Sequence, residues 1–507
     1  MKETISFQPG SAMTRRSMLA TLGAAALTVP VVNVALADEG APKLTESESG
    51  TKTVEGGEVD HKELYGATAR EAIDLGATTE ELDELLDDEP VVTEDLVLPD
   101  GTVVDKAYVA LRNKLNRMSE GIANDPVENS YEMVMRLWTP EEAAQEVLAP
   151  SLKWFNSFDY IRRARKFGVE YTREEAEAIL DNLCDKRLVT RNLRAGTKWY
   201  WLHAWIDGIW ETHIPEVGED LSFVNIGVSG SDYGTGSSFP ILHVCPVDAS
   251  VVEGGVIDEL RDWRLIVDST DSYGIGECIC RLAAKTRGDA EMNGFAREHT
   301  WNGEDGEGFI KTCMVFGEYA DWFIEEGLAE RVTKEEMIAN IETAIEDGFV
   351  PEMYWGEHPG IACMCKSDMC DCLTSYRRVN GNTSNFPKVS GYVLDYDGDA
   401  CVKCGACIDR CPMKAISFGD DGLCVMENCC VACGQCAMIC PASARILKKK
   451  EDIVEKMPFD YIDDLKWRAE DRMQKGYIRD FVGTSLDDNQ ADNDFAAKLE
   501  KHRAAKA

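Results

Sequence analysis

Eight of the nineteen cysteines in this sequence repeat one spacing between residues 401 and 440. The run C-x2-C-x2-C-x3-C-P begins at Cys401 and occurs again at Cys430, 29 residues later. Three thiolates spaced in this way can close on one iron–sulfur cluster as their loop wraps around it. Zinc sites instead combine pairs of C-x2-C. The repeat therefore predicts two [4Fe-4S] clusters with eight ligands, namely Cys401, Cys404, Cys407, Cys411, Cys430, Cys433, Cys436 and Cys440.

The spacing also predicts how the eight ligands divide between the clusters. The fourth cysteine of each run lies beyond a turn of helix, so it reaches the cluster of the other run. We expect one cluster to be held by Cys401, Cys404, Cys407 and Cys440. We expect the other to be held by Cys430, Cys433, Cys436 and Cys411. Gly405 and Gly434 are expected to bring backbone N–H groups close to the sulfides.

Residues 391–448, which contain both runs, resemble a bacterial-type ferredoxin with two [4Fe-4S] clusters. The resemblance implies a ferredoxin-like domain that transfers electrons. Potentials of such clusters span roughly −700 to +450 mV, so the motif does not indicate the direction of electron flow. Cys424 and Cys429 lie between the runs, and we expect both to be bystanders because the repeat selects Cys430.

Seven of the nine cysteines upstream of these runs form a second candidate metal site. Soft thiolates of this kind select zinc, copper or iron–sulfur clusters. The members are Cys278, Cys280, Cys313, Cys363, Cys365, Cys370 and Cys372. The alternative is a set of scattered buried thiols, with a disulfide among them after export. His358 is a further candidate ligand, or else a surface histidine.

The order of these features resembles a wider, thinly characterised family of 4Fe-4S dicluster proteins over residues 125–448. The matching segments are Leu137–Ala143, Leu188–Trp210, Pro246–Val247, Cys278–Arg281, Cys313–Gly317 and Cys363–Cys372. Members of that family tend to carry another cysteine before the Cys-x-x-Phe-Gly segment, whereas Glu291–Thr312 has none here. The resemblance therefore leaves open whether a third metal site exists and which ligands it has.

The N-terminus resembles a twin-arginine export signal. Arg15 and Arg16 precede a weakly apolar run from Leu19 to Leu36, which closes on the small-x-small pattern of residues 35–37. The twin-arginine route carries folded proteins, which suits clusters that are inserted before export. We expect residues 1–37 to be the signal peptide and the protein to lie in the periplasm or on the outer face of the cytoplasmic membrane. An uncleaved signal, or a partner, would attach it to the membrane.

The elements that must position these cysteines indicate an α+β multidomain protein. Capping boxes at Thr139, Thr172 and Thr333 predict helix starts, and two strands are expected at Phe239–Val247 and Arg264–Val267. The predicted parts are an acidic linker (38–104), a helical winged-helix-like domain (105–215), a mixed α/β cysteine-containing domain (216–390), the ferredoxin-like domain (391–448) and a charged helical tail (449–507).

The net negative charge of the chain indicates which classes of partner it can bind. Ninety-one acidic residues against 53 basic ones give a formal charge of −38, which repels nucleic acid and anionic lipid head groups. Although a winged-helix module can bind DNA, the acidic surface and the export signal favour an interaction or structural role here. We expect a redox partner protein and no nucleic acid.

The favoured function is an exported iron–sulfur electron-transfer protein, a subunit or partner of a larger oxidoreductase. The alternative is a reductase in its own right, which would use an additional metal or organic cofactor in the upstream domain. An export signal with two C-terminal clusters is similar to corrinoid reductive dehalogenases in this respect. A DNA-binding regulator is the third class. The sequence singles out no catalytic residue.

Overall fold

The computed structural model describes most of the chain after residue 90 and short stretches before it. The export signal (1–37) and most of the acidic linker lie outside the described residues, apart from a small pair of strands, β1 (Leu44–Glu46) and β2 (Lys52–Val54). Among the helices that are described, none is long and apolar enough to cross a membrane. The main described ranges are 91–122, 127–213, 241–286, 313–367, 370–378, 390–420, 424–426, 428–451, 457–474 and 478–486.

Helices dominate the first part of the described chain. After the strand pair β3 (Leu96–Val97) and β4 (Val103–Val104) come five helices: α4 (Lys106–Asn116), α5 (Glu128–Leu137), α6 (Pro140–Val147), α7 (Ser157–Lys166) and α8 (Arg173–Asp185). Capping boxes at Thr139 and Thr172 start α6 and α8, as the sequence predicts. In each, the threonine hydroxyl accepts a hydrogen bond from the N–H of the third helical residue, which is a glutamate. The carboxylate of that glutamate accepts a hydrogen bond from the threonine N–H.

A two-stranded hairpin follows α8. It joins β5 (Val189–Arg194) to β6 (Thr197–Leu202) in antiparallel register, and the chain then runs through a π-helical turn (Trp205–Ile209) into α9 (Trp210–Thr212). Ala195 and Gly196 both have positive φ, which allows the two-residue turn. Helices followed by a hairpin agree with the expected order of elements, whereas the winged-helix assignment itself stays a prediction.

A six-stranded antiparallel sheet forms the middle of the molecule, in the order β12-β8-β11-β14-β13-β7. Strands β9 (Glu291–Met292) and β10 (Phe295–Ala296) are not part of this sheet and form a two-stranded sheet of their own. The strands of the large sheet are β7 (Leu242–Val244), β8 (Tyr273–Gly276), β11 (Cys313–Phe316), β12 (Ala329–Arg331), β13 (Val350–Tyr354) and β14 (Ile361–Cys365).

The two faces of this sheet carry different side chains. Met314, Met353 and Ala362 lie on one face and pack in a common core with α11 (Trp263–Asp268) and α14 (Lys334–Glu346). The other face carries cysteines and joins the core that contains residues of α12 (Ile279–Thr286), α13 (Gly317–Glu325) and α15 (Asp371–Arg378).

One predicted strand is wrong. Arg264–Val267 belongs to the helix α11, because the Asp262 side chain accepts the Arg264 N–H and caps it. Trp263, Ile266 and Val267 are buried while Leu265 is 46% exposed, which is helical rather than alternating burial. The strand predicted at Phe239–Val247 is present but shorter, since β7 covers only three residues.

The ferredoxin-like part consists of two similar halves. Strand β15 (Tyr392–Tyr396), helix α16 (Ala406–Arg410) and strand β16 (Ile416–Phe418) form the first half. The second half consists of β17 (Cys424–Met426), α17 (Gln435–Met438) and β18 (Arg445–Lys449). The halves pair reciprocally, because the outer strands β15 and β18 are antiparallel partners and so are β16 and β17.

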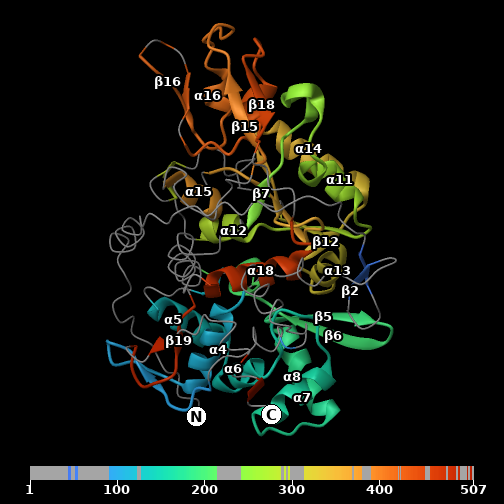
Figure 1. Ribbon diagram of the computed structural model, residues 1–507, viewed down its shortest axis with the longest axis vertical. Coiled ribbons are helices and arrows are strands. Elements are labelled where there is room, and N and C mark those ends of the chain that lie inside the picture. The colour runs from blue at the N-terminus through green and yellow to red at the C-terminus, as the bar shows by residue number, and fades with distance from the viewer. Residues whose placement is uncertain are drawn as a thin grey trace.

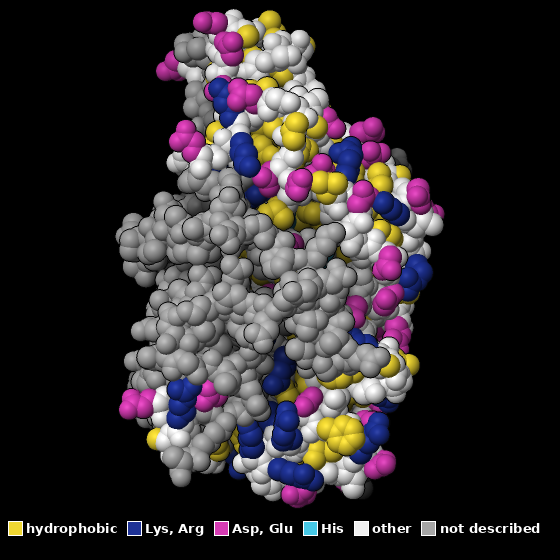
Figure 2. All heavy atoms as spheres, turned by 45° about the vertical axis from the view of Figure 1, so that its right-hand side comes forward, with side chains coloured by type: hydrophobic (Ala, Val, Ile, Leu, Met, Phe, Trp, Pro, Cys, Tyr) yellow, Lys and Arg dark blue, Asp and Glu magenta, His cyan; other side chains and the backbone are white. Residues whose placement is uncertain are grey.

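Figure 1 shows these parts along the long axis, with the ferredoxin-like part at one end, the sheet in the middle and the helical part at the other end. In Figure 2, acidic side chains are scattered over the described surface on the side of α14, and Lys and Arg side chains gather at the lower end. The described residues thus form helices and several separate sheets, and the α+β fold class is confirmed at this level.

The C-terminal tail returns to the first helices. Helix α18 (Tyr461–Gln474) lies between the sheet and the helical part (Figure 1), and the strand pair β19 (Asp480–Phe481) and β20 (Asn489–Gln490) follows it. Arg468, fully buried, pairs with Asp464 of its own helix and with Glu120 beyond α4. Asp480, in β19, forms a second buried ion pair, with Arg117 directly after α4.

The buried Arg468 gives a test of this packing. Replacing it by alanine removes a buried cation from two buried carboxylates, Asp464 and Glu120, which should lower the free energy of unfolding by about 3–5 kcal/mol. A denaturant titration followed by circular dichroism measures the change. The control is Arg162→Ala, which removes an exposed pair with Asp159 and should cost less than about 1 kcal/mol. Equal effects of the two variants would contradict the assigned role of Arg468.

Candidate metal centres

The two cysteine runs fold into loops of the same shape. The Lys403 N–H points at the Cys401 sulfur at 3.4 Å, and the Ala432 N–H points at the Cys430 sulfur at 3.5 Å. Lys403 and Ala432 both have a left-handed backbone, which turns these N–H groups inward.

The fourth cysteine of each run repeats a second contact. The Ala415 N–H lies 3.3 Å from the Cys411 sulfur, and the Ala444 N–H lies 3.3 Å from the Cys440 sulfur. Backbone N–H groups aimed at sulfur stabilise thiolates and tune the clusters that they bind. The duplication seen in the spacing is therefore also a duplication of local structure.

Gly434, in the second loop, has a φ of +90° just before α17. A Cβ atom there would lie 2.6 Å from the Val251 side chain of the central part. The position therefore requires glycine both for its backbone angle and for the close approach of Val251. Gly405 has the equivalent left-handed backbone before α16, with only the Phe418 ring near it.

Cys411 leaves its own run and joins the other one. One cavity is lined by Cys411 together with the three-cysteine loop of the second run, Cys430, Cys433 and Cys436. Burial raises the pKa of Cys436, and the neighbouring thiols of Cys430 and Cys411 raise it further. This geometry is what crossed ligation requires, and the assignment of ligands to clusters stays a prediction.

The remaining four predicted ligands lie closer to solvent. Cys404 is exposed, Cys401 and Cys440 are partly exposed, and Cys407 is buried. Val402, between the first two, is 64% exposed. The loop that begins at Cys401 therefore reaches the surface, whereas three of the four cysteines that line the Cys411 cavity are buried.

The second loop is attached to the central part by buried hydrogen bonds. The Gln435 amide is fully buried and donates to the carbonyl oxygens of Ile345, at the end of α14, and of Phe349. Arg410 donates to the Gln435 side-chain oxygen at 2.8 Å and also to the Ile345 carbonyl. The Val247 N–H donates to the Cys433 carbonyl at 2.9 Å. The predicted second cluster thus faces the body of the protein.

Most of the upstream cysteines come together on one face of the sheet. Across the strands, Gly276 lies opposite Cys313, Cys313 lies opposite Cys363, and Cys363 lies opposite Glu352. Residues directly opposite each other on paired strands have their side chains on the same face of the sheet. The sulfur atoms of Cys313 and Cys363 and the carboxylate of Glu352 therefore lie on one face. Cys365 lies two residues beyond Cys363 and therefore points the same way.

Two helices bring further thiols to this face. Cys278 directly precedes α12, and Cys370 directly precedes α15. A hydrogen bond from Cys280 lowers the pKa of Cys278 to about 7. Contacts with Cys363 and Cys370, together with burial, raise the pKa of Cys365 well above its ordinary value. The side chain of Cys372 lies outside the described residues.

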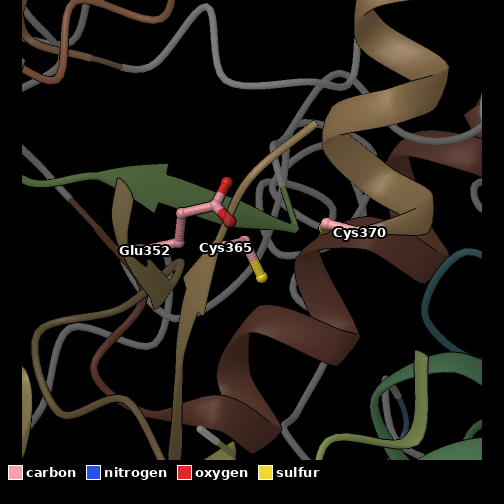
Figure 3. A group of neighbouring side chains, drawn as sticks. All are labelled: Glu352, Cys365 and Cys370. Atoms are coloured by element: carbon pink, nitrogen blue, oxygen red, sulfur yellow. The ribbon is translucent and has the colours of Figure 1, made fainter. Parts of the chain in front are cut away.

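One member of this group was not predicted from the sequence. Glu352 is fully buried on β13, and its carboxylate, the Cys365 sulfur and the Cys370 sulfur all lie within 4.8 Å of one another. Figure 3 shows Glu352 and Cys365 on neighbouring strands, with Cys370 beside a helix. The available signal was an acid in the otherwise apolar run from Phe349 to Trp355.

Other candidates lie elsewhere. His358 is exposed, contacts Ser269 and packs on the ring of Phe459, so it is not part of the cysteine face. Cys429 is buried beside Cys430 but does not line the cavity of Cys411. The side chain of Cys424 lies outside the described residues.

Comparison with known proteins identifies one segment. Residues 394–417 match a family described as a 4Fe-4S binding domain, and they contain the whole first cysteine run. No curated protein and no solved structure matches the chain. The chain therefore carries a 4Fe-4S domain, and this domain supports a role in electron transfer.

Crossed ligation can be tested with single Cys→Ser variants. Cys411→Ser and Cys430→Ser should damage the same cluster, and Cys401→Ser and Cys440→Ser the other. Electron paramagnetic resonance of the reduced protein should therefore show one surviving signal in the first pair of variants and a different one in the second. Cys429→Ser is the matched control and should retain both signals. The assignment is wrong if Cys411→Ser resembles Cys401→Ser instead.

Proposed function

We propose that this chain is an exported electron-transfer protein with two [4Fe-4S] clusters, acting as a subunit or partner of a larger oxidoreductase. The observation that carries the proposal is the duplicated cysteine loop, with the same N–H to sulfur contacts in both halves. The 4Fe-4S domain match in the first half supports the same chemistry in the second, because the halves share spacing and backbone conformation.

The two predicted clusters have different environments, which supports an ordered relay. One has ligands at the surface around Cys404, where a partner can approach. The other would be held by the mostly buried cysteines of the Cys411 cavity, in the loop that Val247 and Gln435 attach to the central part. Electrons would pass between a partner at the outer cluster and the interior at the inner one.

Metal analysis tests the proposal directly. Anaerobically purified full-length protein should contain about eight iron and about eight acid-labile sulfide per chain. About four of each would contradict the second cluster. A stand-alone reductase is the second candidate function, favoured by the buried thiols and carboxylate around Cys365. A corrinoid, flavin or haem that copurifies with the protein would support that candidate over the carrier.

The exposed Val402 gives a test of the outer cluster as the point of electron exchange. Val402→Lys places a positive charge beside Cys401. It should repel basic cytochrome c and slow its reduction by the reduced protein severalfold, with iron content unchanged. Cytochrome c is a basic probe that suits the acidic chain, so the wild-type rate should also fall with added salt. Leu193→Lys, on the exposed face of β5, is the control and should leave the rate unchanged. Equal rates in Val402→Lys and wild type would refute this contact point.

Export rests on Arg15 and Arg16 of the predicted signal. Replacing both by lysine should stop transport by the twin-arginine route and leave the protein, with its clusters, in the cytoplasm. Cell fractionation of the native host measures the change. Lys2→Arg, which lies before the twin-arginine pair, should be exported normally. Periplasmic protein in the double variant would contradict the proposed route.

A further inference from the structure

The buried face of the central sheet contains a carboxylate and two thiols in close contact. Glu352, Cys365 and Cys370 come from β13, from β14 and from the segment before α15, and their ligand atoms are mutually within 4.8 Å. Glu352 pairs with Cys363 and Val350 pairs with Cys365, so the carboxylate is the diagonal neighbour of Cys365 on the same face. The group is thus built by strand register and by the start of a helix, not by one flexible loop.

The spacing of these three atoms indicates one ion rather than a cluster. Ligands that share a tetrahedral zinc ion at about 2.0–2.3 Å lie roughly 3.5–4 Å from one another, which is compatible with the 4.8 Å limit of this group. A [4Fe-4S] cubane spreads its thiolates over separate corners, so its ligands lie farther apart. Two thiolates with one carboxylate suit a divalent transition metal such as zinc or ferrous iron.

The buried carboxylate of Glu352 also favours a bound cation. Glu352 is fully buried, and among the described residues its carboxylate meets the Cys365 thiol but no N–H or O–H donor. A buried carboxylate without such a donor is costly, and a metal ion in contact with it removes that cost.

Arg281 completes the charge balance. It is fully buried at the start of α12 and donates to the Met364 carbonyl, between Cys363 and Cys365. A divalent ion with two thiolates and one carboxylate carries a net charge of −1, which is opposite in sign to this nearby guanidinium.

We propose that Cys365, Cys370 and Glu352 bind a single divalent transition-metal ion, zinc or ferrous iron, in a site separate from the two clusters. Three protein ligands leave a fourth coordination position, as in metal sites that bind a water or a substrate.

The site adjoins the inner cluster along the chain. Ser367, two residues after Cys365, donates both its N–H and its hydroxyl to the Pro412 carbonyl, at 3.1 and 2.9 Å. Pro412 directly follows Cys411, which lines the inner cavity. A short run of covalent and hydrogen bonds therefore joins the proposed ion to a predicted cluster ligand.

Stoichiometry tests the proposal on the full-length, anaerobically purified protein. A [4Fe-4S] cluster holds equal iron and sulfide, so a mononuclear site appears as about one metal ion per chain, iron plus zinc, in excess of acid-labile sulfide. Cys365→Ser, Cys370→Ser and Glu352→Gln should each lose this excess ion and keep the iron and sulfide of the clusters. Added Co²⁺ should give sulfur-to-cobalt absorption in wild type but not in Cys365→Ser.

Cys245→Ser is the matched control, because Cys245 is equally buried in the same part but lies in the core of the opposite face. It should keep the excess ion. Glu352→Gln conserves shape, so it tests the site even if a cysteine variant fails to fold. Equal metal and sulfide in wild type, including about twelve of each from a third cubane, would overturn the proposal. An excess ion that persists in all three variants would do so too. Failure of the two-cluster proposal would appear separately, as a sulfide content below about eight.

Discussion

The buried amide of Gln435 holds the predicted inner cluster loop against the rest of the molecule. Its two donated hydrogen bonds go to carbonyl oxygens at and beyond the end of α14, and its oxygen accepts from Arg410. A buried amide with these partners is satisfied, whereas any shift of the ferredoxin-like part would leave it unpaired at a cost of about 1–3 kcal/mol. The close contact of Gly434 with Val251 restricts the same interface sterically. Because the loop of the second cysteine run is attached to the central part, the loop of the first run is the one that faces outward. This sets the order of the two predicted clusters from the interior to the surface.

The central sheet serves two different purposes on its two faces. Methionine and aliphatic side chains on one face pack under α11 and α14. Cysteines and Glu352 lie on the other, in positions set by alternation along β13 and β14 and by pairing across the strands. A one-residue slip of β14 would turn Cys363 and Cys365 into the apolar core. The same packing that stabilises the first face therefore maintains the thiol arrangement on the second.

Features encoded by local spacing could be predicted from the sequence. The cysteine runs and the capping boxes at Thr139 and Thr333 depend on residues a few positions apart, and the structure has them where the spacing indicates. Glu352 could not be predicted as a member of the thiol group, because its neighbours are set by strand register between distant segments. Arg264–Val267 resembles a strand in the sequence because Leu265, Ile266 and Val267 are apolar in succession, and the cap at Asp262 is the local feature that distinguishes the helix. The buried ion pairs of α18 were missed for a related reason: a charged segment resembles a solvated one until its partners are known.

The return of α18 to the first helices has a consequence for how the protein is made. Glu120 and Arg117 follow α4 in the chain, yet their partners Arg468 and Asp480 lie 348 and 363 residues later. These ion pairs can form only after the central sheet and both cysteine loops, which lie between the partners in the chain, have been synthesised. The polar core of the first helices is therefore completed by a segment that follows the cysteine loops, in the compartment where the chain is made.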